Sequence, residues 1–115
     1  MQIIEKPWGK EELLEVNGAY MLKRLTMHKG HRCSVQYHEF KTETIYVLSG
    51  SLNILSAPQG QPLTSKIYGP NESVTIPVGI VHRMEAVEDC IYLEASTPHL
   101  DDVIRLQDDY NRASQ

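Results

Sequence analysis

Four side chains of this sequence have the types and the spacing of a metal centre. Gln36 and His38 lie two positions apart, so on an extended strand both side chains leave from the same face. Glu43 follows a short polar turn and opens a β-branched and apolar run, and the turn at 77–79 delivers His82 to the start of another strand. Two imidazoles, a carboxylate and an amide oxygen suit Zn, Fe, Mn, Co or Ni about equally well. The donor set therefore predicts a divalent metal without naming it.

The burial expected of these groups strengthens this hypothesis. Placing such polar side chains inside a β-barrel costs several kcal/mol unless each one is paired or bound to an ion. A lone histidine is more often a structural or surface residue, which is how we interpret His28, His31 and His99. As cofactor we therefore expect a divalent metal ion, with zinc as the first choice and Fe, Mn, Co or Ni as alternatives. Without a metal, the same groups would form a polar sugar-binding pocket.

The elements that must position these residues are short strands. Turn signals recur about every eight to twelve residues, and no long helical period appears before residue 100, a pattern typical of an all-β sandwich or barrel. Asn17-Gly18 is a strong hairpin signal. The predicted strands cover residues 10–17, 19–28, 34–38, 43–49, 52–55, 63–68, 73–76, 82–87 and 90–96.

The length and the two ends of the chain suggest one domain. The 115 residues fit a single core, so we assign 1–115 to one domain. Pro7 and Gly9 punctuate an amino-terminal arm at 1–9, where Trp8 is expected to pack in the core. After residue 100, Val103, Leu106 and Tyr110 recur at helical spacing, which predicts a short carboxy-terminal helix over 100–112.

Composition excludes several classes of partner. A net charge of −4 argues against a nucleic-acid surface, because neutralising phosphates needs clustered Lys and Arg. It does not exclude a sugar phosphate, for which a few local cations suffice. The sequence has no apolar run long enough to span a bilayer and no targeting signature, which predicts no membrane partner and a cytoplasmic location. Cys33 and Cys90 are expected to be free packing residues rather than a disulfide.

The spacing of the candidate ligands resembles the two motifs of the cupin superfamily. The first motif matches Gly30–Gly50, with Gln36 in place of its first histidine. The second matches 71–82, with Asn71 in place of its leading glycine. The resemblance implies a jelly-roll barrel, the double-stranded β-helix of cupins, with the metal at its centre.

The glutamine narrows the resemblance further. The run Ser34–His38 matches the Ser-x-Gln-x-His form of the metal-binding cupin domain in phosphomannose isomerases, and 41–43 is similar to their Lys-x-Glu. The segments 6–9 and 101–112 also resemble the ends of that domain in the bifunctional, type II enzymes. The resemblance covers nearly the whole chain and implies an isomerase that converts mannose 6-phosphate to fructose 6-phosphate through an enediolate.

Such a reaction needs a base beside the two reacting carbons and groups that bind the phosphate. Glu94, Lys41 and an arginine-assisted water are the candidate bases. Glu94 shares a face with Tyr92, so its candidacy fails if Tyr92 points outward.

Three further residues complete the predicted site. The resemblance implies that Arg105 stabilises the intermediate, although a surface ion pair with neighbouring aspartates is the alternative. It also places Ser34 near the phosphate, and Lys41 at the barrel mouth could bind the phosphate as well. Lys23 is a further candidate for phosphate binding, unless it is simply the inward-leaning member of the basic pair Lys23-Arg24.

Two other classes of function stay open. The domain could bind a sugar or sugar nucleotide without turnover, or it could be a metal-dependent cupin oxygenase of a small organic substrate, against which Gln36 counts mildly. The chain has no room for a guanylyltransferase domain. Because small cupins have exposed sheet edges, we also predict a homodimer in which the arm with Ile3 and Ile4 adds to a neighbour's sheet.

Overall fold

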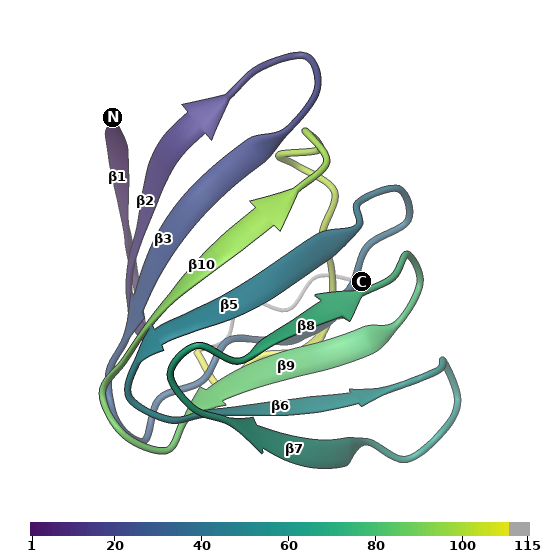
Figure 1. Cartoon of the computed structure of the whole chain (residues 1–115). Coiled ribbons are helices and arrows are strands. Elements are labelled where there is room, and N and C mark those ends of the chain that lie inside the picture. Colours follow the sequence, from purple (N-terminus) through teal and green to yellow (C-terminus); the bar gives the residue numbers. More distant parts are fainter. Residues whose placement is uncertain (111–115) are drawn as a thin grey trace.

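The structure is a computed structural model that describes residues 1–110, and all the regular elements in that range are β-strands (Figure 1). A six-stranded antiparallel sheet has the order β1-β2-β3-β10-β5-β8 and a five-stranded one has the order β11-β4-β9-β6-β7. The first sheet contains β1 (Gln2–Lys6), β2 (Gly9–Val16), β3 (Met21–Met27), β10 (Cys90–Ser96), β5 (Glu43–Ser49) and β8 (Ser73–Ile76). The second contains β11 (Ile104–Gln107), β4 (Val35–Tyr37), β9 (Val81–Ala86), β6 (Leu52–Ala57) and β7 (Thr64–Tyr68).

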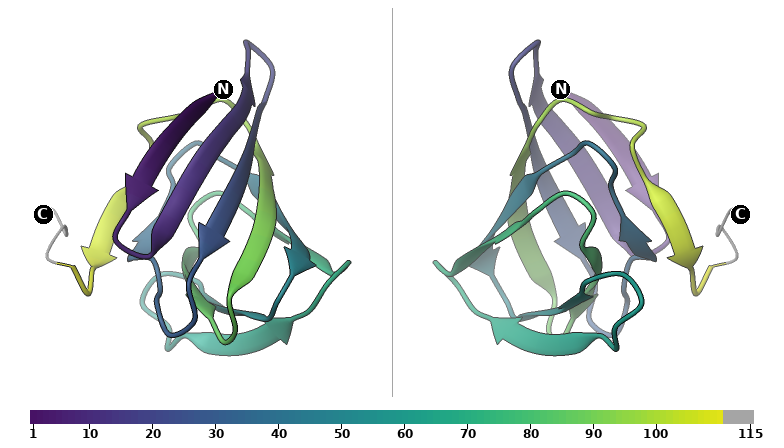
Figure 2. Two further views of the ribbon diagram at one scale, coloured as in Figure 1. Left: turned by 90° about the vertical axis from the view of Figure 1, so that its left-hand side faces the viewer. Right: turned by 90° about the vertical axis from the view of Figure 1, so that its right-hand side faces the viewer.

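The inner faces of both sheets form one core, as the period-two pattern of the strands predicts. Along β3 and β5, every second side chain is buried. Leu25 and Ile45 from one sheet belong to the same buried cluster as Leu52 and Met84 from the other. Figure 2 shows the two sheets enclosing this interior from two opposite sides. The predicted all-β barrel is therefore confirmed, and the interior it encloses is where the candidate ligands meet.

Two turn positions show why the motif residues are of their types. Gly50 has φ of 83°, and a Cβ atom there would lie 2.1 Å from a backbone oxygen of the neighbouring hairpin, so only glycine fits. Asn71, which replaces a motif glycine, has φ of 69° and is the one residue other than glycine with positive φ between 1 and 110. Asparagine tolerates this left-handed conformation better than most residues do. The departure from the motif thus preserves its backbone geometry.

The prediction of a carboxy-terminal helix over 100–112 is wrong. Ile104–Gln107 form strand β11, which pairs with the edge of β4, and no helix occurs among residues 100–110. Positions 111 and 112 of the predicted helix lie outside the described residues. The helical spacing of the apolar side chains here competes with an open row of backbone groups on β4, and strand pairing satisfies that row.

The amino-terminal arm is a strand of the molecule's own sheet. β1 pairs with β2 and lies at the edge of the six-stranded sheet, and Trp8 is only 4% exposed in the hairpin between them. Core packing of Trp8 is confirmed, whereas pairing of β1 with a second chain stays a prediction. Cys33 and Cys90 are free and buried, as expected. Among the described residues there is no helix that could cross a membrane.

Candidate metal centre and its cavity

The four candidate ligands come from both sheets. Gln36 on β4 is the direct cross-strand partner of His82 on β9, and His38 follows β4 immediately. Glu43 is the first residue of β5 in the opposite sheet. Directly opposed residues of an antiparallel pair project to the same face, so Gln36 and His82 both point toward the sheet that carries Glu43.

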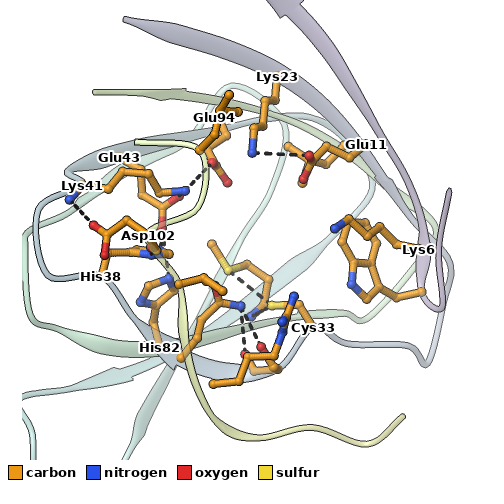
Figure 3. Close-up of a pocket in the computed structure, with 18 of the residues that line it drawn as sticks. Lys6, Glu11, Lys23, Cys33, His38, Lys41, Glu43, His82, Glu94 and Asp102 are labelled. Atoms are coloured by element: carbon orange, nitrogen blue, oxygen red, sulfur yellow. Dashed lines mark hydrogen bonds and ion pairs between the residues drawn. The ribbon is translucent and has the colours of Figure 1, made fainter. Parts of the chain in front are cut away.

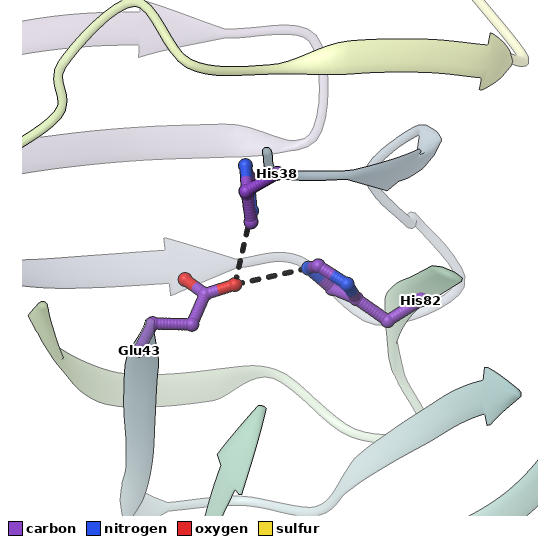
Figure 4. Close-up of side chains that lie close together, drawn as sticks. All are labelled: His38, Glu43 and His82. Carbon is purple, nitrogen blue, oxygen red and sulfur yellow. Dashed lines mark hydrogen bonds and ion pairs between the residues drawn. The ribbon is translucent and has the colours of Figure 1, made fainter. Parts of the chain in front are cut away.

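Three of the four ligands meet at one point (Figure 4). The Nε2 atoms of His38 and His82 lie 3.2 Å and 2.9 Å from the same oxygen of Glu43, Oε1. One ligand atom from each residue lies within 4.8 Å of the others, and each of these side chains is at most 3% exposed. Because metal–ligand bonds to nitrogen and oxygen are about 2.0–2.2 Å long, small side-chain shifts bring all three donors to a shared ion.

The second nitrogen of each imidazole is also fixed. Nδ1 of His38 donates to the backbone carbonyl of Asp102, and Nδ1 of His82 donates to that of Ile80 at 2.9 Å. A neutral imidazole has one N–H, so in each neutral ring the Nε2 lone pair faces Glu43. Metal-binding histidines show this pattern, in which the remote N–H is held by a carbonyl and the other nitrogen faces the ion.

Glu43 makes a cation at this point still more favourable. Burial alone would raise the pKa of Glu43, but its contacts with His38, His82 and Lys41 hold that pKa well below its ordinary value. Glu43 is therefore a carboxylate, held ionised by hydrogen bonds from the two rings and by the charge of Lys41. When both rings are neutral with the proton on Nδ1, their Nε2 lone pairs face Glu43 instead. A shared cation satisfies all three donors at once with both rings neutral, so the residues present fit a metal ion.

Gln36 lines the same cavity but is held by Ser34 and not by Glu43. Its amide nitrogen donates to the hydroxyl oxygen of Ser34 at 3.0 Å and to the Ser34 carbonyl at 3.3 Å. These two bonds use the NH₂ end, which leaves the carbonyl oxygen available as a ligand atom. A fourth ligand from Gln36 stays a prediction.

A chain of buried charges extends from the metal-ligand candidates into the interior (Figure 3). Nζ of Lys41 lies 3.2 Å from Glu94 and 3.7 Å from Glu43. Burial and the negative charge of Glu43 raise the pKa of Glu94 to about 7, against the opposite effect of Lys41 and Lys23. Burial would lower the pKa of Lys41, but Glu94 and Glu43 together raise it, so Lys41 is a cation. A cation bound beside Glu43 would offset part of the rise at Glu94.

All nine residues singled out in the sequence line one cavity of about 130 Å³. A single water needs only ~10–15 Å³ of such space, so the cavity has room for a small ligand or several waters. Tyr92 is 1% exposed, which places Glu94 on the inner face as its candidacy requires. The nine are Lys23, Ser34, Gln36, His38, Lys41, Glu43, His82, Glu94 and Arg105. Their roles stay predictions.

Arg105 enters the cavity from β11. It is the cross-strand partner of Gln36, so Arg105, Gln36 and His82 form a row across three neighbouring strands. Its Nε atom is buried and has no hydrogen-bond partner among residues 1–110. Among residues 1–110, Asp109 pairs with Arg32 and Arg83 instead of Arg105, and the ion pair of Arg105 with its neighbouring aspartates stays an alternative.

Several lining residues were not identified from the sequence. Glu11 lines the cavity and pairs with Lys23 at 3.4 Å, and Lys6 and Asp102 also line it. The run of charged residues that opens 10–17 gives no periodic signal that would place Glu11 on an inner face. Asp102 lies within the predicted helix over 100–112, so the sequence did not place it at the cavity.

Comparison with known proteins finds one family and several relatives that match nearly the whole chain. The family described as mannose-6-phosphate isomerase C-terminal matches residues 1–108. Mannose-1-phosphate guanylyltransferase ManC of Salmonella typhimurium is 31% identical over 119 residues, covering 95% of this chain and 23% of that protein. Alginate biosynthesis protein AlgA of Pseudomonas aeruginosa is 31% identical over 118 residues, covering 97% of this chain and 23% of that protein. The chain thus spans about a quarter of the length of these relatives.

Solved structures support the fold. The capsular polysaccharide assembling protein CapF of Staphylococcus aureus matches with a TM-score of 0.82 at 19% identity, over 92% of this chain and 31% of that one. An oxalate decarboxylase of Bacillus subtilis matches with a TM-score of 0.81 at 15% identity, over 91% of this chain and 30% of that one. An RmlC-like cupin of Shewanella frigidimarina matches with a TM-score of 0.74 at 20% identity, over 87% and 86% of the two chains. The barrel is therefore a cupin fold.

Proposed function

Because this chain belongs to the mannose-6-phosphate isomerase C-terminal family, we propose that it is a metal-dependent isomerase of mannose 6-phosphate and fructose 6-phosphate. The observation that carries the proposal is the pair of imidazoles whose Nδ1 atoms bind backbone carbonyls while both Nε2 atoms face Glu43. The two relatives are named as a guanylyltransferase and an alginate biosynthesis protein. The proposal therefore assigns isomerisation to the quarter of those proteins that this chain matches.

His38, Glu43 and His82 would hold the metal, with Gln36 as a fourth ligand. We propose zinc, since two imidazoles and a carboxylate are ligands that zinc binds in catalytic sites with a position left open. A divalent ion there supplies Lewis-acid stabilisation of negative charge that develops on the oxygens of C1 and C2. The buried walls exclude bulk water from this charge.

Glu94 is the proposed base. Its carboxylate is buried, lines the cavity and is not one of the predicted ligands. It would take the proton from C2 of the aldose and return it to C1, while the hydroxyl proton on O2 passes to O1, so that aldose and ketose contain the same atoms. Lys41, at 3.2 Å, holds the Glu94 carboxylate in place and contributes a positive charge to the cavity.

The remaining polar groups would bind the rest of the substrate. The buried Nε of Arg105 is a hydrogen-bond donor with no acceptor among residues 1–110, and a substrate oxygen is the kind of group it would bind. Lys23 and the Ser34 hydroxyl are the proposed contacts of the phosphate. Lys23 is 7% exposed and neutralised in part by Glu11, so its ion pair would loosen when an anion enters.

The direct test is turnover by metal-stripped protein that is reloaded with Zn, Co, Mn, Fe or Ni, one metal at a time. Fructose 6-phosphate formed from mannose 6-phosphate would be measured for the wild type, His82→Ala and Glu94→Gln, with His28→Ala as the exposed histidine control. Loss of a general base lowers turnover by about 10²–10⁴-fold, and we expect a drop of this size in Glu94→Gln. Absence of product with every metal in the wild type would refute the isomerase.

The other two classes of function give different outcomes in the same assay. Saturable binding of a sugar phosphate or sugar nucleotide without product would indicate a binding domain. Oxygen consumption with a small organic substrate would indicate an oxygenase. Metal analysis of the protein as purified separates an empty site from a loaded one before any substrate is tried.

A further inference from the structure

The segment that follows β10 contains Asp102, which forms hydrogen bonds with the loop 38–42. This loop carries His38 and Lys41. We propose that Asp102 is a positioning residue of the metal centre: its carboxylate fixes the backbone of 39–41, and its carbonyl fixes the ring of His38. The inference rests on the proposed metal centre and adds to it a residue that determines metal affinity without touching the metal.

The carboxylate contact is specific in its geometry. The two oxygens of Asp102 accept hydrogen bonds from the backbone N–H groups of Glu39 at 3.0 Å, Phe40 at 2.7 Å and Lys41 at 2.8 Å. Three successive N–H groups that converge on one anion form a nest, a backbone conformation that binds anions. Residues 38–42 lie outside the strands, so these bonds replace the sheet hydrogen bonds that the loop lacks.

The carbonyl contact acts on the ligand itself. The backbone oxygen of Asp102 accepts a hydrogen bond from Nδ1 of His38, which fixes that tautomer and directs Nε2 toward Glu43. The backbone of His38 has one further anchor, since its carbonyl accepts the N–H of Gly79 at 2.8 Å. Outer partners of this kind set ring orientation, and their loss typically lowers metal affinity about 10–100-fold.

The same grip extends to the cation of the site. The N–H of Lys41 is bound to Asp102, while its Nζ reaches Glu94 and Glu43. A shift of the loop would therefore move a metal ligand and the partner of the proposed base together. One carboxylate couples the two.

A second aspartate provides the comparison that separates positioning from general anchoring. Asp109 lies beyond β11 and forms ion pairs with Arg32 and with Arg83, the latter at 3.1 Å. It holds the other end of the same segment, and its side-chain contacts among residues 1–110 go to these two arginines and not to loop 38–42. Loss of Asp109 should loosen the segment and lower stability while the grip on the loop persists.

The test is a calorimetric titration of metal-stripped protein with Zn²⁺ for the wild type, Asp102→Ala and Asp102→Asn. Asp101→Ala, an exposed neighbouring carboxylate, and Asp109→Ala serve as controls. We expect affinity to fall about 10–100-fold in Asp102→Ala, and less in Asp102→Asn because an amide oxygen still accepts hydrogen bonds. Asp101→Ala should equal the wild type, and Asp109→Ala should lose melting temperature but keep its affinity within about twofold, a change of only ~0.4 kcal/mol.

A second readout does not depend on metal. Nitrogen NMR of the metal-free protein reports the tautomer of His38, which we expect to carry its proton on Nδ1 in the wild type and to populate both tautomers in Asp102→Ala. Unchanged affinity and tautomer in the Asp102 variants, or an equal loss of affinity in Asp109→Ala, would overturn the positioning role. If the wild type binds no metal, the proposed function fails, and the tautomer alone decides the role of Asp102.

Discussion

Replacement of Lys41 by methionine tests the charge arrangement of the site. Lys41 is 6% exposed and lies between two buried carboxylates, 3.2 Å from Glu94 and 3.7 Å from Glu43. In metal-free Lys41→Met, both carboxylates lose this cation. Removing one partner of a buried ion pair destabilises a protein by about 3–5 kcal/mol, so we expect the free energy of unfolding to fall by this amount above neutral pH.

The loss should depend on pH in a definite direction. Burial and the charge of Glu43 already raise the pKa of Glu94 to about 7, and loss of Lys41 raises it further. A carboxyl group whose pKa is raised by folding binds more protons in the folded state, so stability is retained at low pH and lost as pH rises through the raised pKa. The Glu94 part of the defect in Lys41→Met should therefore be small near about pH 5 and should grow as pH rises above about 7. The Glu43 part should already be present at about pH 5, because Glu43 is ionised there.

A bound metal should reverse part of the effect. Lys41 and a cation compete for the charge of Glu43, so the variant should bind Zn²⁺ at least about tenfold more tightly, or ~1.4 kcal/mol. Lys41→Met should thus be destabilised less when it is loaded with metal, even as turnover falls.

The assay is urea unfolding of metal-free and metal-loaded protein at several pH values. Lys29→Met is the matched control, because Lys29 pairs with Glu88 at 3.6 Å on the surface and such pairs contribute about 0–1 kcal/mol. The double variant Lys41→Met/Glu94→Gln should regain much of the lost stability, since it removes one orphaned carboxylate. A loss no larger than that of Lys29→Met, or a loss independent of pH, would refute the reasoning.

Three further changes test the turns, the core and the metal centre. Gly50→Ala should cost more than about 3 kcal/mol of unfolding free energy because its Cβ would clash with backbone, whereas Gly60→Ala, which has positive φ but open space, should cost only about 1–2 kcal/mol; urea unfolding compares them. Burial raises the pKa of Cys33 and Cys90 to about 11, so alkylation near neutral pH should label them only after unfolding, as mass spectrometry would show; rapid labelling of the native protein would contradict this burial. A chelator should lower the melting temperature of metal-loaded wild type by the equivalent of about 2.7 kcal/mol when free metal was 100-fold above Kd, and should leave His82→Ala unshifted.

The strands could be predicted because their signal is local. Alternation of buried and exposed side chains along 19–28 and 43–49 determines which face of each strand turns inward, and glycine-rich turns mark their ends. The prediction of a helix at 100–110 was wrong because a contact distant in the chain decides the structure there. Val103, Leu106 and Tyr110 fit a helical period, but the backbone of β4 offers an unpaired edge that no local pattern reveals.

Which polar side chains face the cavity could also be predicted, because strand periodicity is a local signal. Gln36 and His38 lie on one strand face, Tyr92 and Glu94 on another, and a core that must bury Tyr92 carries Glu94 inward with it. The contacts of Asp102 could not be predicted from the sequence, because they join it to residues 38–41, which are far away in the chain.

The sequence by itself determined which chemical groups face the interior of this protein, because strand periodicity and turn chemistry act over a few residues. Only the tertiary structure decided that two imidazoles share one oxygen of Glu43 and that Lys41 lies between two carboxylates. It also decided that Asp102 binds the backbone of loop 38–42. These contacts join strands and loops distant in the chain. Their distances follow from how the two sheets pack, and the charges and tautomers of the groups follow from those distances.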